Sequence, residues 1–391
     1  MLHRLGAVAG TWLVCFFCNA MKNYDLIVVG AGIVGLAHAY TAATRGRSVL
    51  VIERDGACLG ASIRNFGFVT ITGQRAGAHW RRAMRSRDVW AEIAPKAGID
   101  VLHAGLWLTA RRPAAAAVLE AFMHTEMGEG CELLTPAQAA ARHPALRTDG
   151  LQSVLYSPHE LRVESRTAIP QLALWLQQDL GVDFAYSESV TEVATPRVTT
   201  SRGKYHAERV VVCNNADPGG LFAGEWASNK VQLCQLQMLR VKPQAGFKLE
   251  GSVMGDLSLV RYEGYSALPE ATALRAELER EETESLKHGI HLIAVQSADG
   301  SLVVGDSHHY GSAPQPFASE AVDQLMLRHM HEALHIDKAQ VVERWTGIYP
   351  SSAEAPCFVK APDAATRVVA VTSGSGASTA FGLAEEVWKA W

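Results

Sequence analysis

An apolar run near the N-terminus leads directly into a glycine-rich turn, and this junction constrains the fold more than any other part of the sequence. The run Asp25–Val29 is followed by Gly30-Ala-Gly32-Ile-Val-Gly35, and a second apolar run ends at Glu53. A G-x-G-x-x-G turn between a strand and a helix, with an acidic residue after the next strand, is typical of a dinucleotide-binding βαβ unit.

The glycines of this turn have separate mechanical roles. Gly30 permits the tight turn, Gly32 lets the backbone approach a pyrophosphate, and Gly35 lets the helix pack against the strand. The free N–H groups of Ile33 and Val34, at the start of the helix, are expected to face the phosphates.

The acidic residue narrows the choice of dinucleotide. The Glu53 carboxylate is expected to accept hydrogen bonds from both hydroxyls of a ribose, and its charge would repel the 2′-phosphate of NADP. The turn and Glu53 together leave NAD and FAD open as the ligand.

Composition excludes several classes of protein. The chain has 391 residues, of which 48% are hydrophobic and 19% charged, so it is long enough for two globular domains. Its net charge of −4 gives no support to a nucleic-acid partner. The seven cysteines are odd in number and scattered, which indicates a reducing compartment and a cytoplasmic protein.

The chain begins with a leader that resembles a signal or an anchor: Arg4 is followed by an uncharged stretch from Leu5 to Met21. The first strand begins only a few residues later, without a linker, and Met21 followed by Lys22 would be a natural start. We therefore expect residues 1–20 to be an over-extended start, with a targeting segment as the alternative, and we expect no stable membrane insertion.

The rest of the chain predicts an α/β fold, α+β overall, with a Rossmann-like nucleotide domain and an inserted antiparallel-sheet domain. The sequence predicts that strands 291–296 and 301–305 form a hairpin that turns at Asp299-Gly300. It predicts a strand at 257–262 and a helix in the charged segment 271–288. The strand Arg367–Val371 again has the apolar pattern of the strands in the nucleotide-binding unit. We assign 21–80, 155–225 and 335–391 to the nucleotide domain, and 81–154 and 226–334 to the inserted substrate domain.

Three nucleotide-type segments identify a family. They are the first glycine turn, the strand Val210-Val-Val-Cys-Asn-Asn-Ala216, and the turn Thr372-Ser-Gly374-Ser-Gly376. Their order resembles the FAD-dependent amine oxidoreductases of the D-amino-acid oxidase, glycine oxidase and sarcosine oxidase type, over nearly all of 23–391. The resemblance implies FAD bound without a covalent bond, since no cysteine lies in Trp345–Tyr349.

The resemblance also implies which residues hold FAD. The backbone of Val190 would meet the adenine, and the last glycine turn would meet the pyrimidine end of the flavin, where the helix that follows points its positive end. The implied cofactor residues are Gly30, Gly32, Ile33, Val34, Gly35, Glu53, Arg54, Ser62, Arg64, Asn65, Val190, Gly374, Gly376 and Thr379.

Four further segments are similar to a subgroup associated with bacterial phosphonate breakdown. These segments are 60–67, Gln237-Met238, 305–310 and 345–349. The similarity implies oxidation of an aminophosphonate related to 2-aminoethylphosphonate, in which a hydride passes to flavin N5 and the imine hydrolyses to an aldehyde plus ammonia or an amine. Oxygen or another carrier would accept the electrons. A glycine, sarcosine or D-amino-acid oxidase, or a non-catalytic nucleotide-binding protein, is the alternative.

The substrate site departs from the amino-acid oxidases at Tyr349, where they usually carry a carboxylate-binding arginine. Arg64, Arg261 and His308 are the candidate partners for a phosphonate. The alternative for Arg261 is a charge exposed to solvent at the end of a strand, and the alternative for His308 is a purely structural hydrogen bond. His308 is also the first candidate for a catalytic residue. The aromatic side chains that could wall the site are Tyr262, Tyr265, Trp345 and Tyr349, although aromatic side chains in such positions more often belong to the core.

The sequence also contains a zinc-protease pattern, His331-Glu-Ala-Leu-His335. The apolar stripe of its helix contains Val322, Met326 and Met330, and both histidines fall opposite that stripe, towards water. We therefore expect no metal there, and no metal elsewhere in the chain.

Overall fold

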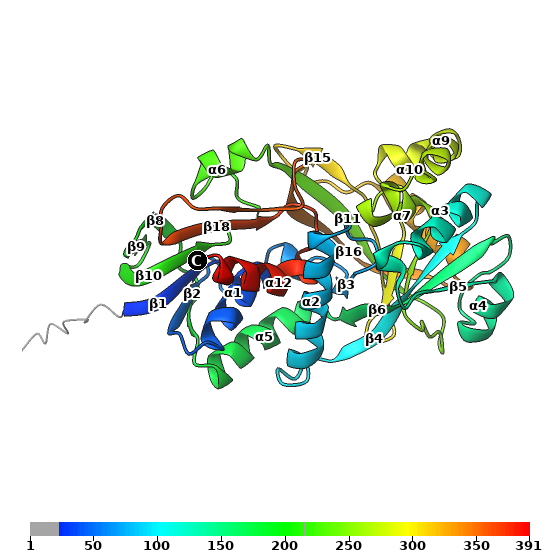
Figure 1. Cartoon of the computed structure of the whole chain (residues 1–391). Helices are drawn as coiled ribbons and strands as arrows, with labels where there is room; N and C mark the ends of the chain where they lie inside the picture. The colour runs from blue at the N-terminus through cyan, green and yellow to red at the C-terminus, as the bar shows by residue number, and fades with distance from the viewer. Residues whose placement is uncertain (1–22, 215) are drawn as a thin grey trace, which may run out of the picture.

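The parallel sheet that carries the nucleotide motif lies at one end of the molecule (Figure 1). The computed structural model describes residues 23–214 and 216–391. Strand order in this sheet is β17-β18-β10-β1-β2-β7, and β18, β10, β1, β2 and β7 run parallel to one another, whereas β17 is antiparallel to β18. Its strands are β1 (Asn23–Val29), β2 (Val49–Ile52), β7 (Asp183–Ala185), β8 (Val190–Ala194), β9 (Arg197–Thr200), β10 (Lys204–Val212), β17 (Cys357–Lys360) and β18 (Thr366–Val371).

The second sheet is mainly antiparallel and has the order β15-β11-β14-β13-β12-β4-β6-β3, with β16 on β11 and β5 on β6. The long pair β11–β16 forms one wall, and β4–β6 forms another. Its strands are β3 (Phe68–Val69), β4 (Val101–Ala110), β5 (Glu132–Leu134), β6 (Ser153–Val163), β11 (Gln232–Lys242), β12 (Ser252–Met254), β13 (Ile293–Gln296), β14 (Leu302–Gly305), β15 (His309–Gly311) and β16 (Gln340–Ser351).

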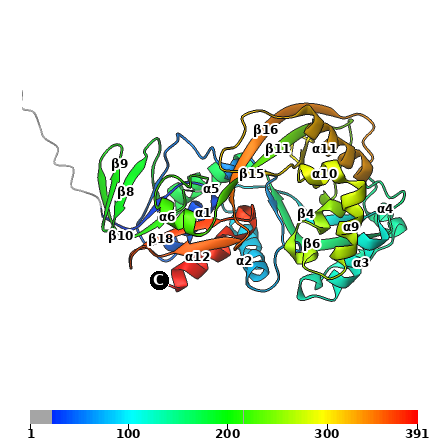
Figure 2. The same cartoon turned by 90° about the horizontal axis from the view of Figure 1, so that it is seen from above.

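Helices cover the two sheets separately. Figures 1 and 2 show α1, α5 and α12 beside the parallel sheet, whereas α3, α4, α9 and α10 lie at the far end of the molecule. The helices are α1 (Ile33–Ala43), α2 (Ala78–Ile93), α3 (Pro113–Met123), α4 (Pro136–Arg142), α5 (Ser165–Asp179), α6 (Ala223–Ser228), α7 (Asp256–Leu259), α8 (Glu263–Ser266), α9 (Ala271–Glu281), α10 (Thr283–Lys287), α11 (Glu320–Ala333) and α12 (Gly376–Lys389), with short 3-10 turns η1 (Ala61–Ile63) and η2 (Glu126–Gly128).

The predicted fold class is confirmed: a parallel nucleotide sheet is joined to a curled antiparallel sheet. The predicted hairpin is also confirmed, because β13 and β14 pair antiparallel on either side of Asp299-Gly300. The strand predicted at 257–262 is wrong, since the structure has α7 there. Its apolar run is short and buried, and such a run does not distinguish strand from helix.

The charged helix predicted at 271–288 is divided into α9 and α10 at Glu282. Glu282 has non-helical backbone (φ −120°, ψ 32°), and its buried carboxylate binds Arg328 Nη2 at 2.6 Å. The predicted outward direction of the His331-x-x-x-His335 pattern is confirmed, since both residues are exposed and His335 lies beyond the end of α11.

The predicted domain boundaries stay a prediction. Strands β3, β6 and β16, which fall mostly within the segments assigned to the nucleotide domain, pair with the antiparallel sheet. The leader 1–20 lies outside the described residues. Among residues 23–214 and 216–391, no helix combines the length and the apolar character needed to cross a bilayer.

Candidate active site

A cavity of about 930 Å³ lies along the carboxyl ends of β1, β2 and β10. Ligands of open parallel sheets bind at this edge, where the loops after neighbouring strands meet. The predicted cofactor residues that line this cavity are Gly30, Gly32, Glu53, Arg54, Ser62, Arg64 and Val190.

The glycine turn is packed too closely for any other residue. Gly30 has φ +103°, and a Cβ there would lie 2.6 Å from the carbonyl oxygen of Cys213. A Cβ on Gly35 would lie 1.9 Å from the Gly30 carbonyl oxygen, so this glycine lets α1 sit directly against the turn. A Cβ on Gly32 would face the open cavity and the Ser62 hydroxyl at 3.1 Å, which leaves room for a ligand to approach the backbone.

Glu53 is held where a ribose would be bound. Its Oε2 accepts the Ala31 N–H at 2.8 Å and its Oε1 accepts the Asp55 N–H at 3.1 Å. Each carboxylate oxygen has a second lone pair, so Glu53 can still accept hydrogen bonds from two ribose hydroxyls. Ser62 Oγ accepts the Ile33 N–H at 2.9 Å and so lies at the start of α1, beside the expected pyrophosphate position.

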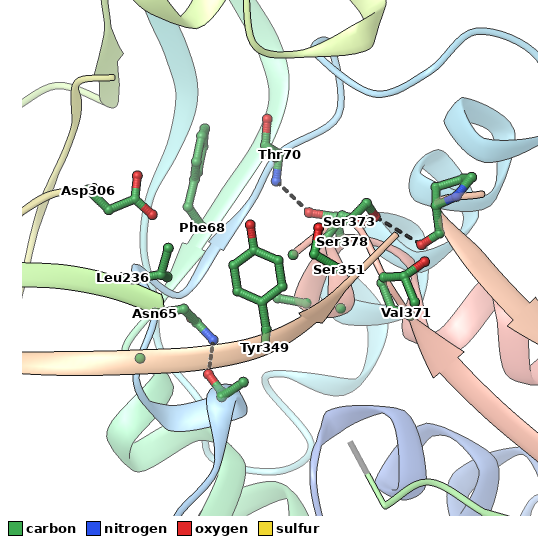
Figure 3. A pocket seen from close by; sticks show the side chains of 18 of the residues that line it. Asn65, Phe68, Thr70, Leu236, Asp306, Tyr349, Ser351, Val371, Ser373 and Ser378 are labelled. Atoms are coloured by element: carbon green, nitrogen blue, oxygen red, sulfur yellow. Dashed lines mark hydrogen bonds between the residues drawn. The ribbon is translucent and has the colours of Figure 1, made fainter. Parts of the chain in front are cut away.

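A second cavity, of about 310 Å³, adjoins the first, because Ala61, Ser62, Arg64 and Ile348 line both. It extends from the start of α1 to the turn 372–378, where α12 begins at Gly376 and presents free backbone N–H groups. Figure 3 shows Ser373 and Ser378 of this turn beside Thr70, whose N–H donates to Ser378 Oγ at 3.0 Å.

The two cavities together fit an extended dinucleotide. The first offers the glycine cradle and a ribose-binding carboxylate, and the second offers a helix N-terminus at its far end. A Cβ on Gly374 would lie 3.1 Å from the Tyr349 ring, so a larger residue would close this end of the cavity. The donor groups and the open space therefore suit FAD.

Beyond the turn 372–378, the residues that line the second cavity include the cation Arg261 and several hydroxyls. The Arg261 guanidinium lies 3.3 Å from the Tyr310 hydroxyl and 3.4 Å from the Tyr349 hydroxyl. Among residues 23–214 and 216–391, no carboxylate pairs directly with Arg261. Burial raises the pKa of Tyr349 well above its usual value, so its hydroxyl stays protonated and can donate.

The same cavity also contains one buried carboxylate, Asp306, between two imidazoles. His291 Nε2 lies 3.0 Å from Oδ1, and His308 Nε2 lies 3.6 Å from Oδ2. Figure 3 shows the Asp306 carboxylate and the Tyr349 hydroxyl pointing into the same space. A fixed cation and a fixed anion thus line one small cavity.

A family model described as "DAO: FAD dependent oxidoreductase" matches residues 25–389. The chain belongs to the DAO family of FAD-dependent oxidoreductases. Its cofactor is accordingly FAD. Among curated proteins, none matches the chain.

Solved structures of DAO-type enzymes share its fold. Glycine oxidase from Geobacillus kaustophilus is 20% identical, with a TM-score of 0.74 and 94% of each chain covered. L-proline dehydrogenase from P. horikoshii is 17% identical, with a TM-score of 0.77, and 95% of this chain and 94% of that chain are covered. L-α-glycerophosphate oxidase from Mycoplasma pneumoniae, solved with FAD bound, is 16% identical, with a TM-score of 0.70 and coverage of 95% and 96%.

The structure brings most predicted site residues of this DAO-family chain to the two cavities. Ile33, Val34 and Asn65 line the smaller one with Gly374 and Gly376, and so do all the predicted substrate residues, Arg64, Arg261, Tyr262, His308 and Tyr349. The Asn65 amide is used within its own loop, where it donates to Ala61 O and accepts from Gly67 N.

Four predicted residues lie elsewhere. Gly35 serves packing, and the fully buried Thr379 donates to the Ser375 carbonyl oxygen without lining either cavity. Tyr265 is buried in the core of the second domain, and Trp345 packs at the edge of that core while its Nε1 donates to the Arg64 carbonyl oxygen. For Tyr265 and Trp345 the structure thus has the core position that the sequence offers as the alternative, and neither lines the substrate cavity.

Several lining residues carried no recognisable signal in the sequence. His291 begins the strand 291–296, which the sequence predicts only as one arm of a hairpin, and Tyr310 ends the segment 305–310, which is noted only for its resemblance. His79 lies on α2, where its Nε2 is 3.3 Å from Ser375 Oγ at the start of α12. The register of the second sheet and the position of α2, both tertiary features, bring these residues to the cavity.

Proposed function

We propose that this oxidoreductase oxidises a small amine that carries an anionic group, and that the substrate is an aminophosphonate related to 2-aminoethylphosphonate. Bound FAD supplies the two-electron acceptor for the C–H bond next to nitrogen. The side chains of this protein bind and orient the amine. The observation that carries the proposal is the presence of Arg261 and Asp306 on one small cavity.

Arg261 is the proposed partner of the anionic group. Within residues 23–214 and 216–391, its guanidinium hydrogen-bonds only the hydroxyls of Tyr310 and Tyr349, so its charge is available to a ligand. A half-buried guanidinium without a direct carboxylate partner favours binding of an anion, and Arg forms strong two-fold hydrogen bonds with phosphonate-like oxygens. Asp306, the opposite charge, suits the ammonium group of the same substrate.

The number of donors favours a phosphonate over a carboxylate. Tyr310 and Tyr349 add two hydroxyls beside Arg261. The Arg64 side chain lines the same cavity, and in the described part of the chain no other side chain hydrogen-bonds to it. A phosphonate has three oxygens and up to two charges, whereas a carboxylate has two oxygens and one charge. The sequence similarity of 305–310 and 345–349 to the phosphonate subgroup supports the same substrate.

An amino acid is the second candidate substrate. Glycine oxidase and L-proline dehydrogenase share the fold, and an arginine binds a carboxylate as readily as a phosphonate.

The domain division stated above is proposed with the same roles: segments 21–80, 155–225 and 335–391 hold FAD, while 81–154 and 226–334 mainly surround the substrate. A cytoplasmic location and oxygen as the electron acceptor stay predictions.

Anaerobic bleaching of the flavin tests the proposal. We expect 2-aminoethylphosphonate or its N-methyl or 1-hydroxy form to bleach the flavin, and β-alanine, which differs only in its carboxylate, to do so at least tenfold more slowly. The product should be an aldehyde with ammonia or methylamine. Bleaching by glycine, sarcosine or L-proline but by no aminophosphonate would establish the amino-acid alternative. Acid precipitation should release the flavin into solution, because its binding is proposed to be non-covalent.

A further inference from the structure

Three titratable side chains, His291, Asp306 and His308, meet at the wall of the substrate cavity. His291 and Asp306 extend the β13–β14 hairpin, since the Asp306 N–H donates to the His291 carbonyl oxygen at 3.1 Å. One atom of each group lies within 4.8 Å of the others, and all three residues are at most 6% exposed. The two imidazole rings stack, with centroids 5.2 Å apart.

The outer ring nitrogen fixes the tautomer of His308. His308 Nδ1 lies 2.9 Å from the Gly289 carbonyl oxygen, which can only accept, so Nδ1 carries the proton. The one hydrogen of the Ser258 hydroxyl is within reach of both His291 Nδ1, at 3.2 Å, and the Leu292 carbonyl oxygen, at 3.3 Å, so His291 can carry its proton on either ring nitrogen. In the neutral His308 ring, Nε2 therefore presents a lone pair to the inner side of the cluster.

The inner side of the cluster consequently contains a vacant acceptor at His308 Nε2. This atom lies 3.6 Å from Asp306 Oδ2, and His291 Nε2 lies 3.0 Å from Oδ1. Each ring faces a different oxygen, which suits two separate N–H···O bonds better than a single metal ion at one shared point. The cluster therefore has a vacant position for a proton, and the carboxylate would stabilise the imidazolium that results.

The charges around the cluster keep this position vacant in the resting protein. Burial lowers the pKa of His308 well below its usual value, and Arg261 lowers it further. Burial also lowers the pKa of His291, whereas His308 and His291 hold the pKa of Asp306 below its usual value against the effect of burial. The other titratable groups that act on the cluster are those of Tyr262, Tyr310, Tyr349 and Cys234.

We propose that His291, Asp306 and His308 form the proton acceptor for the substrate ammonium. This inference depends on the proposed function only in requiring that the substrate is an amine. The ammonium pairs with Asp306, its N–H bond breaks, and the electron pair stays on the substrate nitrogen. The proton forms an N–H bond at His308 Nε2, and the imidazolium is then held by the carboxylate. The neutral amine that remains is the form that can be oxidised.

Nitrogen NMR of the imidazoles tests the resting state without any substrate. In the ¹⁵N-histidine holoenzyme at pH 7, we expect the ring of His308, assigned by the His308→Gln variant, to be protonated at Nδ1 and unprotonated at Nε2. A ring that is already an imidazolium would overturn the proposal, because the position would be filled. Stoichiometric metal in the active holoenzyme, measured by mass spectrometry, would overturn it too.

Variants test the proton transfer with whichever amine bleaches the flavin fastest, so the result does not depend on that amine being a phosphonate. Asp306→Asn should slow flavin reduction at pH 7 by about 100-fold, with recovery as the pH approaches the pKa of the free amine. His308→Gln provides a second variant if Asp306→Asn does not bind FAD. The exposed His331→Gln is the matched control and should follow the wild type. Parallel pH profiles for wild type and both cluster variants would overturn the proposal.

Discussion

The guanidinium Nη2 of Arg261 lies 3.4 Å from the hydroxyl of Tyr349, although 88 residues separate them in the chain. Arg261 follows α7, and Tyr349 lies on β16 next to the end of the parallel sheet. The cation therefore comes from a different segment than Tyr349, the position where the amino-acid oxidases that the sequence resembles usually carry an arginine. The Tyr349 ring lies next to Gly374, where an added Cβ would be 3.1 Å from it.

The first prediction is that Arg261→Gln weakens substrate binding more than it slows the chemical step. A hydrogen-bonded charge contributes about 1.5–3 kcal/mol, which corresponds to roughly 10- to 150-fold in affinity. Stopped-flow flavin reduction should show that rise in Kd with a limiting rate within a few-fold of the wild type. Arg280→Gln, on the surface of α9 where the side chain bonds only within its own helix, is the control. An unchanged Kd would remove Arg261 from the binding site.

The second prediction concerns Glu53 and FAD. Glu53→Gln keeps the shape of the side chain but removes the charge that binds the Ala31 N–H and the expected ribose hydroxyls. We expect the Kd of FAD for the apoprotein to rise about tenfold or more, because hydrogen bonds to a charged group contribute more than neutral ones. Titration calorimetry measures this Kd, and Glu279→Gln on α9 makes the same change of charge at the surface. Equal affinities in the two variants would contradict the assigned role.

The third prediction concerns the packing of the glycine turn. A Cβ on Gly35 would lie 1.9 Å from the Gly30 carbonyl oxygen, so Gly35→Ala must move α1 away from the turn. Overpacking of this kind costs about 1–3 kcal/mol, and we expect the flavin content of the purified protein to fall to about a tenth or less. Gly203→Ala, where no atom lies within 4 Å of the added Cβ, should retain its flavin. The ratio of flavin to protein absorbance gives both results.

The nucleotide half of the site could be predicted from sequence because its geometry is local. Gly30, Gly32 and Gly35 lie within one turn, and Glu53 ends the strand that pairs with β1, so spacing alone places them together. Thr379 is predicted to bind FAD, but it lies a few residues too far along α12 to line the cavity. In a helix, a shift of three or four residues keeps the face but moves the side chain away from the N-terminal end that meets the cavity.

The substrate half could be predicted only in part, because its residues come from separate strands whose register no local pattern specifies. Asp306 was recognised only as the end of a hairpin, although the pairing of β13 with β14 places it opposite His291. Arg261 was chosen correctly for the cavity, but the segment around it was predicted as a strand and forms α7 instead. A short buried apolar run has no period that separates the two structures.

The last prediction is that a buried histidine of α1 limits stability in acid. Burial lowers the pKa of His38 to about 4, and its Nε2 has no hydrogen-bond partner among the described residues. In the unfolded chain the same group titrates near its ordinary value of about 6.5. Between these two values the unfolded state binds more protons than the folded state, so stability falls as the pH is lowered from about 6.5 to about 4.

His38→Leu should remove this contribution, since leucine fills a similar buried volume and does not titrate. We expect the free energy of unfolding to differ little from the wild type at pH 7.5, and the variant to be about 2 kcal/mol more stable, relative to the wild type, at pH 5. Urea unfolding with excess FAD, at both pH values, measures the difference. The exposed His335→Leu should leave the pH dependence unchanged. If His38→Leu and the wild type lost the same stability between pH 7.5 and pH 5, the acid sensitivity would arise from the other buried histidines, His103 and His143, whose pKa values burial also lowers.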